Sequence, residues 1–598
     1  MGINERITQL RKEMKELGLN AYVIPSSDPH LSEEVSDHWM GRMYFSGFTG
    51  SAGTLVVTET ESGLWTDGRY FIQAETQLAP TEIKLFKMGQ PNVPTLIDYL
   101  LLELSPGDCV GFDGHVLSAY QVNQMKQIFS QKGIDICGDY DIVETIWTNR
   151  PAIPNSDVFI HEVKYTGFSC AEKIKKVRDE LVEKEVDGVV LTELGCIAWV
   201  FNIRGDDISF NPMVISYGFI TKEEAYLFVE PSRLSKSVMK YLEKNGVCVK
   251  PYDAIDEVIQ EVCNPIKVLC HAHTINAYLY EVLSSNEWIT VIEGTDIVNE
   301  LKAIKNDVEV ANIREAQIKD GCALVEAMQF IYERLENNET VTEYDVADIL
   351  EFSRRKQILN YGSSFMPIIG YKENAAMMHY RPTKEMNHEL KQEGFLLIDS
   401  GGQYLDGTTD ITRTFVLGPT TDEENRHFTL VLKAHIGLSR AIFQEGCTGG
   451  NLDILSRFHL WTHGLDYRCG TGHGVAYFGA VHEGPQGFGL RSSIPLKKGM
   501  MLTNEPGIYE EGRHGVRIEN TLLVVEDQKT EYGQFYRFEV VSYFPIETRA
   551  LVLELLSDDE VSWLNNYHQM VREQLIPRLN GKSLDWLLTR TELIKREF

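Results

Sequence analysis

The sequence predicts two similar α/β domains followed by a larger mixed α+β domain. Length is the first reason, because a chain of 598 residues exceeds the size at which one hydrophobic core stops growing. The second reason is an internal repeat, in which the stretch around Ile7 resembles the stretch around Ile174. The third is a change of pattern near Phe395, after which short β-rich runs alternate with Gly-rich turns. We therefore expect a multidomain α/β and α+β protein with domains at 1–155, 156–302 and 303–598.

Each copy of the repeat reads as an amphipathic helix that leads into a short apolar strand. Ser169 and Glu172 form a capping box, which gives the second helix a local reason to begin there. The strands expected after the two helices are 21–24 and 188–191, and Pro151 and Pro154 mark a polar linker between the domains. The matched pairs, which follow the spacing of one helix face, are Ile7/Ile174, Leu10/Val177, Arg11/Arg178 and Met14/Leu181.

The third domain is predicted to open with a long helix. Asn306 and Glu309 form its capping box, and apolar residues recur on one side as far as Ile331. Beyond Phe395, the runs FLLID, TRTFVLG and RIENTLLVVE predict strands of a largely antiparallel sheet. The stretch 558–579 has a helical pattern again.

Composition narrows the classes of partner. The chain carries 87 acidic and 57 basic residues, a net charge of −30, so we expect neither nucleic acid nor an anionic membrane as a partner. The first 16 residues lack the apolar core of a signal peptide, and no run approaches the length of a membrane span. Ten dispersed cysteines without CxxC pairs suit a reducing compartment, so a cytoplasmic protein is expected.

Acidic residues stand at unusual places in the third domain. Asp399 closes an apolar strand run, and Asp410 follows across GGQYLDGTTD, so two strands joined by that turn would bring both carboxylates together. His473 lies in GTGHG, Glu505 in TNEPG, and Glu519 ends the run 516–518. Taken singly, each has a simpler explanation as a turn or cap residue. Buried carboxylates are costly without a positive partner, however, and four carboxylates with one imidazole suit two bridged ions of manganese, cobalt or zinc.

Several segments resemble one known family. IDSGGQYLDGTTDITRT, GTGHGV, VHEGP, NEPG and GVRIEN are similar to the motif series of the pita-bread metallopeptidases. With NAAMMHYRP and two preceding domains, the chain most resembles the three-domain, cytosolic-type aminopeptidase P, or Xaa-Pro aminopeptidase. The resemblance extends to DPHLSEE, GFTGSAGT and WTDGRY in the first domain and AWVFNIRGDDISFNP in the second. It implies creatinase-like N-terminal domains and a pita-bread catalytic domain that removes the N-terminal residue from peptides with proline second.

The resemblance also assigns roles to residues. It implies that Glu505 is the general base, that His379 and His482 orient the scissile peptide, and that Arg517 supports the carboxylate ligands. Ligands of two divalent ions, manganese first and cobalt or zinc as alternatives, fall on Asp399, Asp410, His473, Glu505 and Glu519. Tyr380 is a candidate pocket wall, with a core position as the alternative. Asp28, His30, Arg69 and Tyr70 lie in polar segments of the first domain that, in the family, approach the mouth of the active site, sometimes from a partner subunit. A homodimer is implied as well.

Two departures from the family pattern stand out. Cys469 occupies the position of a histidine that the family directs toward the substrate, and Ala476 stands where glycine is usual. The loss of a protonatable donor at Cys469 would lower activity or change its pH dependence, and a neutral replacement is the alternative.

Three other functions stay open at this point. A proline dipeptidase of the same fold would keep the five ligands, although two full N-terminal domains argue against it. A non-catalytic peptide-binding or protein-binding module would be expected to lose the ligands, and metal-free hydrolysis of the creatinase type would not need four carboxylates.

Overall fold

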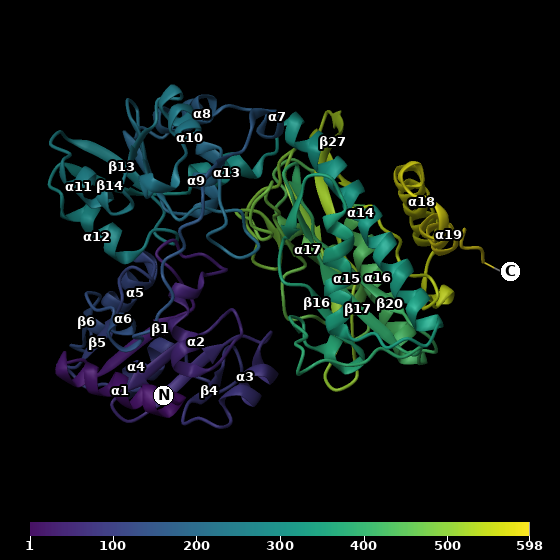
Figure 1. Ribbon diagram of the computed structural model, residues 1–598, viewed down its shortest axis with the longest axis horizontal. Helices are drawn as coiled ribbons and strands as arrows, with labels where there is room; N and C mark the ends of the chain where they lie inside the picture. The colour runs from purple at the N-terminus through teal and green to yellow at the C-terminus, as the bar shows by residue number, and fades with distance from the viewer. Residues whose placement is uncertain (597–598) are drawn as a thin grey trace. The chain divides into compact units, whose positions relative to one another are not determined.

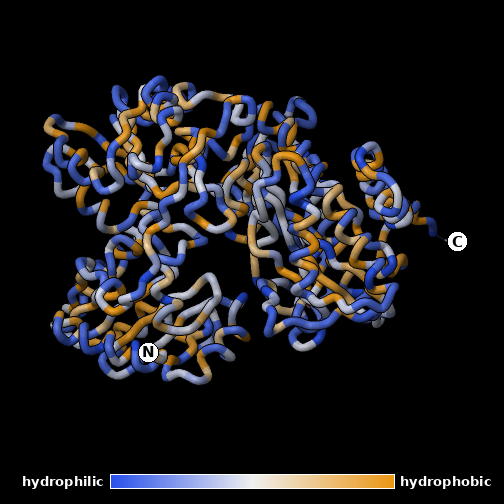
Figure 2. Tube along the Cα trace, in the orientation of Figure 1, coloured by the Kyte–Doolittle hydropathy of each residue, from blue (hydrophilic) through white to orange (hydrophobic). Residues whose placement is uncertain are grey.

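The computed structural model describes residues 1–596, and these form two compact units. The first unit comprises 1–162 and 168–298, and the described residues of the second are 163–167 and 299–596. Figure 1 traces both, and in Figure 2 apolar and polar stretches alternate along the chain in each unit. No helix in the described part of the chain is long and apolar enough to cross a membrane.

The first unit contains two six-stranded sheets with the same topology. Their strand orders are β4-β3-β2-β1-β5-β6 and β12-β11-β10-β8-β13-β14. In both sheets the strand that opens the repeat, β1 (Ala21–Pro25) or β8 (Gly188–Leu191), pairs antiparallel on one side and parallel on the other. The helices before them, α1 (Ile3–Glu16) and α8 (Cys170–Glu183), bury the matched apolar faces. The predicted duplication is therefore confirmed strand by strand.

The other strands of the two sheets match in order along the chain. The first sheet also contains β2 (Thr54–Thr58), β3 (Ser62–Thr66), β4 (Lys84–Lys87), β5 (Cys109–Phe112) and β6 (Asp135–Cys137). The second also contains β10 (Tyr217–Thr221), β11 (Ala225–Phe228), β12 (Cys248–Lys250), β13 (Ile266–Cys270) and β14 (Ile289–Glu293).

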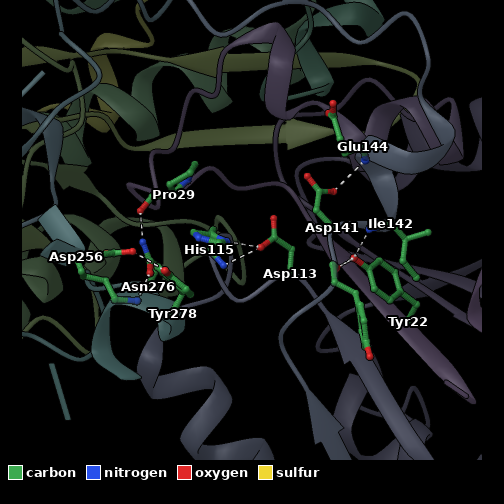
Figure 3. A network of polar contacts seen from close by, with 12 residues as sticks. Tyr22, Pro29, Asp113, His115, Asp141, Ile142, Glu144, Asp256, Asn276 and Tyr278 are labelled. Carbon is green, nitrogen blue, oxygen red and sulfur yellow. Dashed lines mark hydrogen bonds and ion pairs between the residues drawn. The ribbon is translucent and has the colours of Figure 1, made fainter. Parts of the chain in front are cut away.

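Polar contacts join the two sheets' domains within the first unit (Figure 3). Asn276 donates its amide to the carbonyl of Pro29 at 2.8 Å, and the ring of His115 stacks on Tyr278 with centroids 4.1 Å apart. His30 is buried here, with Nδ1 2.8 Å from the carbonyl of Thr192. The loop that carries Asp28 and His30 is thus packed on the second domain.

The second unit is built around the long helix α14 (Asp307–Glu336). Its capping box at Asn306 and Glu309 forms as predicted, because the Asn306 side chain accepts from the backbone of Glu309 while the Glu309 side chain reaches back. α14 contacts α15 (Glu343–Arg355) and α19 (Gly581–Arg590). Helix α18 (Asp558–Leu575) agrees with the pattern seen at 558–579.

All strand pairings of the second unit are antiparallel in its described residues, but they form several short sheets instead of one. One sheet has the order β16-β17-β20 and another β21-β28-β27-β24. Their strands are β16 (Ile368–Tyr371), β17 (Phe395–Ser400), β20 (Ile411–Val416), β21 (Ile442–Gln444), β24 (Met501–Asn504), β27 (Asn520–Thr530) and β28 (Gly533–Val540). Two helices, α16 (Asp422–Ser439) and α17 (Gly449–Trp461), pack against each other beside them.

The connection between β17 and β20 differs from the simple turn that the sequence suggested. It contains two further short strands, β18 (Gly402–Tyr404) and β19 (Gly407–Thr408), which pair with each other in a separate sheet. The expected pairing of β17 with β20 nevertheless forms. The two strands are antiparallel, and Asp399 lies opposite Thr412. Asp399 and Asp410 therefore lie at the same end of this strand pair.

Candidate metal centre

Five side chains from separate strand ends meet in the second unit. Asp399 is the penultimate residue of β17 and Asp410 directly precedes β20. Glu505 directly follows β24. His473 is the last residue of β22 (Gly472–His473). Glu519 lies in the short connection between β26 (His514–Arg517) and β27. Strand ends thus supply all five, although Glu519 lies just outside the strand that the sequence suggested it would end.

The distances place these groups in one cluster. Nε2 of His473 lies 3.4 Å from a carboxylate oxygen of Asp410 and 3.3 Å from one of Glu505. Ligand atoms of Asp410, His473 and Glu519 all lie within 4.8 Å of one another. Asp399 is close enough to Asp410 and Glu505 for their charges to raise its pKa. The structure therefore brings together all five residues that the sequence singled out.

Glycines permit this close approach. A Cβ on Gly472 would lie 2.0 Å from the carbonyl oxygen of Thr503, and one on Gly474 would lie 2.0 Å from that of Glu483. Neither position has room for a side chain, so the GTGHG run serves the close backbone approach that its glycines predicted. His473 is also fixed by its own backbone, whose N–H donates to the hydroxyl of Thr503 at 3.0 Å.

Burial and mutual repulsion shape the protonation of the cluster. Burial is the main reason that the pKa of Asp399 rises to about 6, with Arg517 opposing the rise and Asp410 and Glu505 adding to it. Burial also raises the pKa of Glu519 well above its usual range, and Asp410 adds to the effect. Burial opposes the charge on His473, yet Asp410 and Glu505 together raise its pKa to about 9. Such a concentration of buried negative charge calls for a positive counterion.

Two orphaned atoms indicate where that counterion belongs. Oδ1 of Asp399 and Oε1 of Glu519 are buried and have no hydrogen-bond partner. Their other oxygens are held, since Arg517 donates to Oδ2 of Asp399 at 2.6 Å and Thr412 donates to Oε2 of Glu519 at 2.7 Å. Buried carboxylate oxygens are rarely left unsatisfied. The donor set of four carboxylates and one imidazole therefore fits divalent cations of the manganese, cobalt or zinc type.

A layer of hydroxyl and guanidinium groups orients the carboxylates. Arg517 donates to Asp399, to the hydroxyl of Tyr509 at 2.7 Å and to that of Thr412 at 3.1 Å. Sequence reasoning found Arg517 but missed Thr412 and Tyr509. Thr412 lies two residues beyond Asp410 on a strand, which puts both side chains on one face, and that spacing was the signal available.

The remaining predicted residues of this unit lie near the cluster to different degrees. The exposed ring of His482 is T-shaped against that of His473, with centroids 4.1 Å apart. His379 is half-buried and follows Met378, whose carbonyl accepts from Arg517 at 3.5 Å. Tyr380 is buried and donates to Glu343 at 3.0 Å. A core contact thus accounts for Tyr380.

Cys469 is half-buried beside Tyr509, and its carbonyl accepts from Arg457 at 2.6 Å. Ala476 is buried.

Asp28 and Arg69 belong to the first unit. Asp28 is fully buried, and its Oδ1 accepts from the backbone of His30 and of Ser32 at 2.9 and 3.0 Å. Arg69 pairs with Asp67 at 2.7 Å. These contacts hold the Arg69 guanidinium and one oxygen of Asp28, whereas Oδ2 of Asp28 is buried with no hydrogen-bond partner among the described residues.

Comparison with protein families agrees with the arrangement of the domains. Residues 311–526 match the model of metallopeptidase family M24, and 534–594 match the C-terminal region of that peptidase. Residues 6–142 and 149–309 each match a creatinase/prolidase N-terminal domain.

Individual relatives extend the likeness over the whole chain. The chain is 37% identical to Aminopeptidase P2 of Arabidopsis thaliana, over 98% of this chain and 88% of that protein. Among solved structures, X-prolyl aminopeptidase of Caenorhabditis elegans, described as a cytosolic enzyme with a di-nuclear active site, superposes with a TM-score of 0.95 and 34% identity. That match covers 99% of this chain and 100% of the other.

A dipeptidase gives a shorter match. The Xaa-Pro dipeptidase of Bacillus anthracis superposes with a TM-score of 0.51 and 26% identity, and it covers 63% of this chain and 99% of the dipeptidase. The chain with its five converging donors is thus similar along its full length to the aminopeptidases and along part of it to the dipeptidase. It belongs to the Xaa-Pro aminopeptidase branch of metallopeptidase family M24.

Proposed function

We propose that this chain is a metal-dependent aminopeptidase that releases the N-terminal residue from peptides whose second residue is proline. The observation that carries the proposal is the convergence of Asp399, Asp410, His473, Glu505 and Glu519 within a chain that matches an X-prolyl aminopeptidase from end to end. The same five residues would hold two divalent cations, manganese first, with cobalt or zinc as alternatives. When bound, the cations supply Lewis acidity that lowers the pKa of water and polarises the substrate carbonyl.

Glu505 is the residue we assign as proton acceptor. Its side chain is partly exposed, at 22%, whereas those of Asp410 and Asp399 are at 5% and 11%. It is therefore the carboxylate of these three that water reaches most readily. A hydroxyl donor, Thr503, lies 3.2 Å from one of its oxygens and orients the group. Glu505 would take the proton of the attacking water and return it toward the leaving nitrogen.

The substrate would be held by groups around this cluster. His379 and His482 would donate hydrogen bonds to the carbonyl oxygen of the scissile bond as negative charge develops on it. Arg517 and Cys469 complete the proposed set within this unit. Arg69 and Asp28 of the first unit are proposed as substrate residues from the family resemblance alone. Because the bond to proline has no N–H, recognition must use the shape of the pyrrolidine ring and not an amide donor.

A peptide-length comparison tests the proposal. The manganese-loaded chain should hydrolyse an Xaa-Pro-Xaa tripeptide with a higher kcat/KM than the matching Xaa-Pro dipeptide, and it should release the first residue. Preference for the dipeptide would instead establish a dipeptidase, a function that the partial match to the B. anthracis enzyme does not favour. Fewer than one bound ion per chain together with no hydrolysis would favour the non-catalytic module.

We propose a homodimer on the strength of an exposed apolar face on α17. Phe458 and Trp461 are 58% and 42% exposed, and Ile454 on the same helix is 39% exposed. These positions follow the 3-and-4 spacing of one helix face, and large exposed apolar patches mark interaction surfaces. A cytosolic location is proposed from the description of the C. elegans relative.

We propose that the chain divides into domains at 1–155, 156–302 and 303–598. Support comes from the two six-stranded sheets, which occupy 21–137 and 188–293. The last boundary falls inside the short helix α13 (Ile297–Ala303).

A further inference from the structure

Glu483, the residue after His482, forms a buried cluster of charges with two lysines. The carboxylate of Glu483 is 2.7 Å from Nζ of Lys305 and 3.1 Å from Nζ of Lys302. The three side chains are 7%, 1% and 3% exposed. Burying three charges is costly unless each has close partners, so removal of one charge from this cluster is expected to disturb the other two. Neither lysine belongs to the five-residue donor set. Lys302 lies in the last turn of α13, and Lys305 lies between α13 and the start of α14.

The main chain of Glu483 connects this cluster to the candidate metal centre. Its N–H donates to the carbonyl of Gly474 at 2.7 Å. The same carbonyl lies 2.9 Å from Nδ1 of His473. A carbonyl only accepts, so Nδ1 of His473 donates to it, and in the neutral ring, the form that can bind a cation, the lone pair is on Nε2, which faces Asp410 and Glu505. The Gly474 carbonyl thus selects the tautomer of His473.

The tight packing at this contact leaves little freedom. A Cβ on Gly474 would lie 2.0 Å from the carbonyl oxygen of Glu483 and 2.5 Å from Nε2 of Gln486. A shift of the Glu483 backbone would therefore be transmitted to Gly474 and then to the imidazole of His473. Because His482 immediately precedes Glu483, its ring would move as well.

We infer that Lys302 and Lys305 are positioning residues that act through Glu483. They hold the 482–483 backbone against Gly474, and this contact sets both the free nitrogen of His473 and the place of His482. The inference rests on the proposed function for its catalytic consequence, but its effect on cation affinity does not depend on the substrate. Removal of a residue that orients a metal ligand without touching the metal typically changes metal affinity or activity about 10–100-fold.

Matched substitutions in the full-length chain test the inference. Lys305→Met removes the charge that contacts Glu483 at 2.7 Å and keeps a side chain of similar length. The control is Lys433→Met, which removes a largely buried partner of Glu560 in the same unit, at 2.6 Å. Mn²⁺ affinity by calorimetry, kcat and KM on an Xaa-Pro-Xaa peptide, and the melting temperature are measured for each variant.

We expect both variants to melt at lower temperature, whereas only Lys305→Met weakens Mn²⁺ binding and lowers kcat, each by about tenfold or more. Lys305→Arg should restore most of the loss. Equal stability losses with unchanged Mn²⁺ affinity and kcat in Lys305→Met would overturn the inference. If Lys305→Met does not fold, Lys302→Met at the longer contact provides the same comparison.

The two proposals fail in different ways. A wild-type chain that binds Mn²⁺ but does not cleave the peptide contradicts the proposed function, while the Mn²⁺ affinities of the variants still decide the positioning role.

Discussion

At the scale of single residues, the candidate centre depends on which oxygens are already satisfied. Arg517 and Thr412 each occupy one oxygen of a buried carboxylate and leave the other oxygen without a partner. Ligand atoms of Glu519, Asp410 and His473 lie within 4.8 Å of one another. The hydrogen bonds from Arg517 and Thr412 therefore decide which carboxylate oxygens remain for cations. Residues that make such bonds matter nearly as much as the ligands.

Glu505→Gln should abolish turnover while the fold is retained. The amide keeps the size of the side chain but cannot accept the proton of water, so we expect kcat to fall about 10²- to 10⁴-fold. Stopped assays on an Xaa-Pro-Xaa peptide measure the loss, and an unchanged melting curve confirms folding. A variant that keeps more than a tenth of the wild-type kcat would remove Glu505 from the proton-accepting role.

Cys469→His should raise activity or broaden its pH range. Cys469 lies beside Tyr509, the residue that binds Arg517, so an imidazole there would add a donor next to the residues that support the candidate metal centre. One hydrogen bond to a charged group is worth about 1.5 kcal/mol or more, and this corresponds to roughly tenfold in kcat/KM. The full pH profile of kcat/KM is the measurement. A superimposable profile would mean that the cysteine is a neutral replacement.

At the scale of elements, local signals predicted the boundaries well. The capping boxes at Ser169 and Asn306 form as expected, and the repeated helix–strand units appear with matched pairings. The acids at strand ends were also visible in the sequence, because a charged residue that closes an apolar run is unusual. Such signals involve neighbours a few positions apart, where the spacing itself carries the information.

Contacts between residues far apart in the chain left no comparable signal in the sequence. Lys305 and Glu483 are 178 positions apart, and lysines near a helix start are ordinarily solvent-exposed. The β18–β19 pair inside the β17–β20 connection was missed for another reason, since its strands have only three and two residues. Neither feature has a periodicity that a sequence can reveal.

Asn306→Ala should destabilise the second unit. The Asn306 side chain accepts from the backbone N–H groups of Val308 and Glu309, which have no partner within the helix. Loss of such a cap costs about 1 kcal/mol in the free energy of unfolding. Urea denaturation followed by circular dichroism provides the measurement, with Asn337→Ala, at the exposed C-cap of α14, as the control. Equal midpoints for Asn306→Ala and wild type would contradict a stabilising cap.

At the scale of the whole molecule, association is proposed to run through α17. Phe458→Asp combined with Trp461→Asp should convert dimers to monomers, because burying carboxylates at an apolar contact is unfavourable. Size-exclusion chromatography with light scattering reports the mass. Phe352→Asp, at a side chain that is 65% exposed on α15, is the matched control and should leave the mass unchanged. A double variant that stays dimeric would place the interface elsewhere.

Acid should weaken the second unit through a buried histidine. Burial lowers the pKa of His568 to about 4, and Arg413 and Arg572 contribute, while Glu547 opposes them. Below the ordinary histidine pKa of about 6.5 the unfolded chain binds the proton and the folded chain does not, so stability falls as the pH drops from about 6.5 toward 4. The full loss is on the order of 3 kcal/mol.

His568→Gln should therefore flatten the dependence of unfolding free energy on pH between about 6.5 and 4. Urea midpoints across that range test the change, and His463→Gln at an exposed histidine should retain the wild-type slope. If both variants show the same slope as the wild type, His568 does not carry the effect.

The two matching sheets have a consequence for how the chain emerges from the ribosome. Every strand of the first sheet lies within 21–137 and every strand of the second within 188–293, so each closes its own ladder from a continuous stretch. Domains commonly fold in order during translation. Both sheets can be complete while the residues of the candidate centre, which span 399–519, are still being added. The candidate centre is then completed only after the N-terminal half has been able to fold.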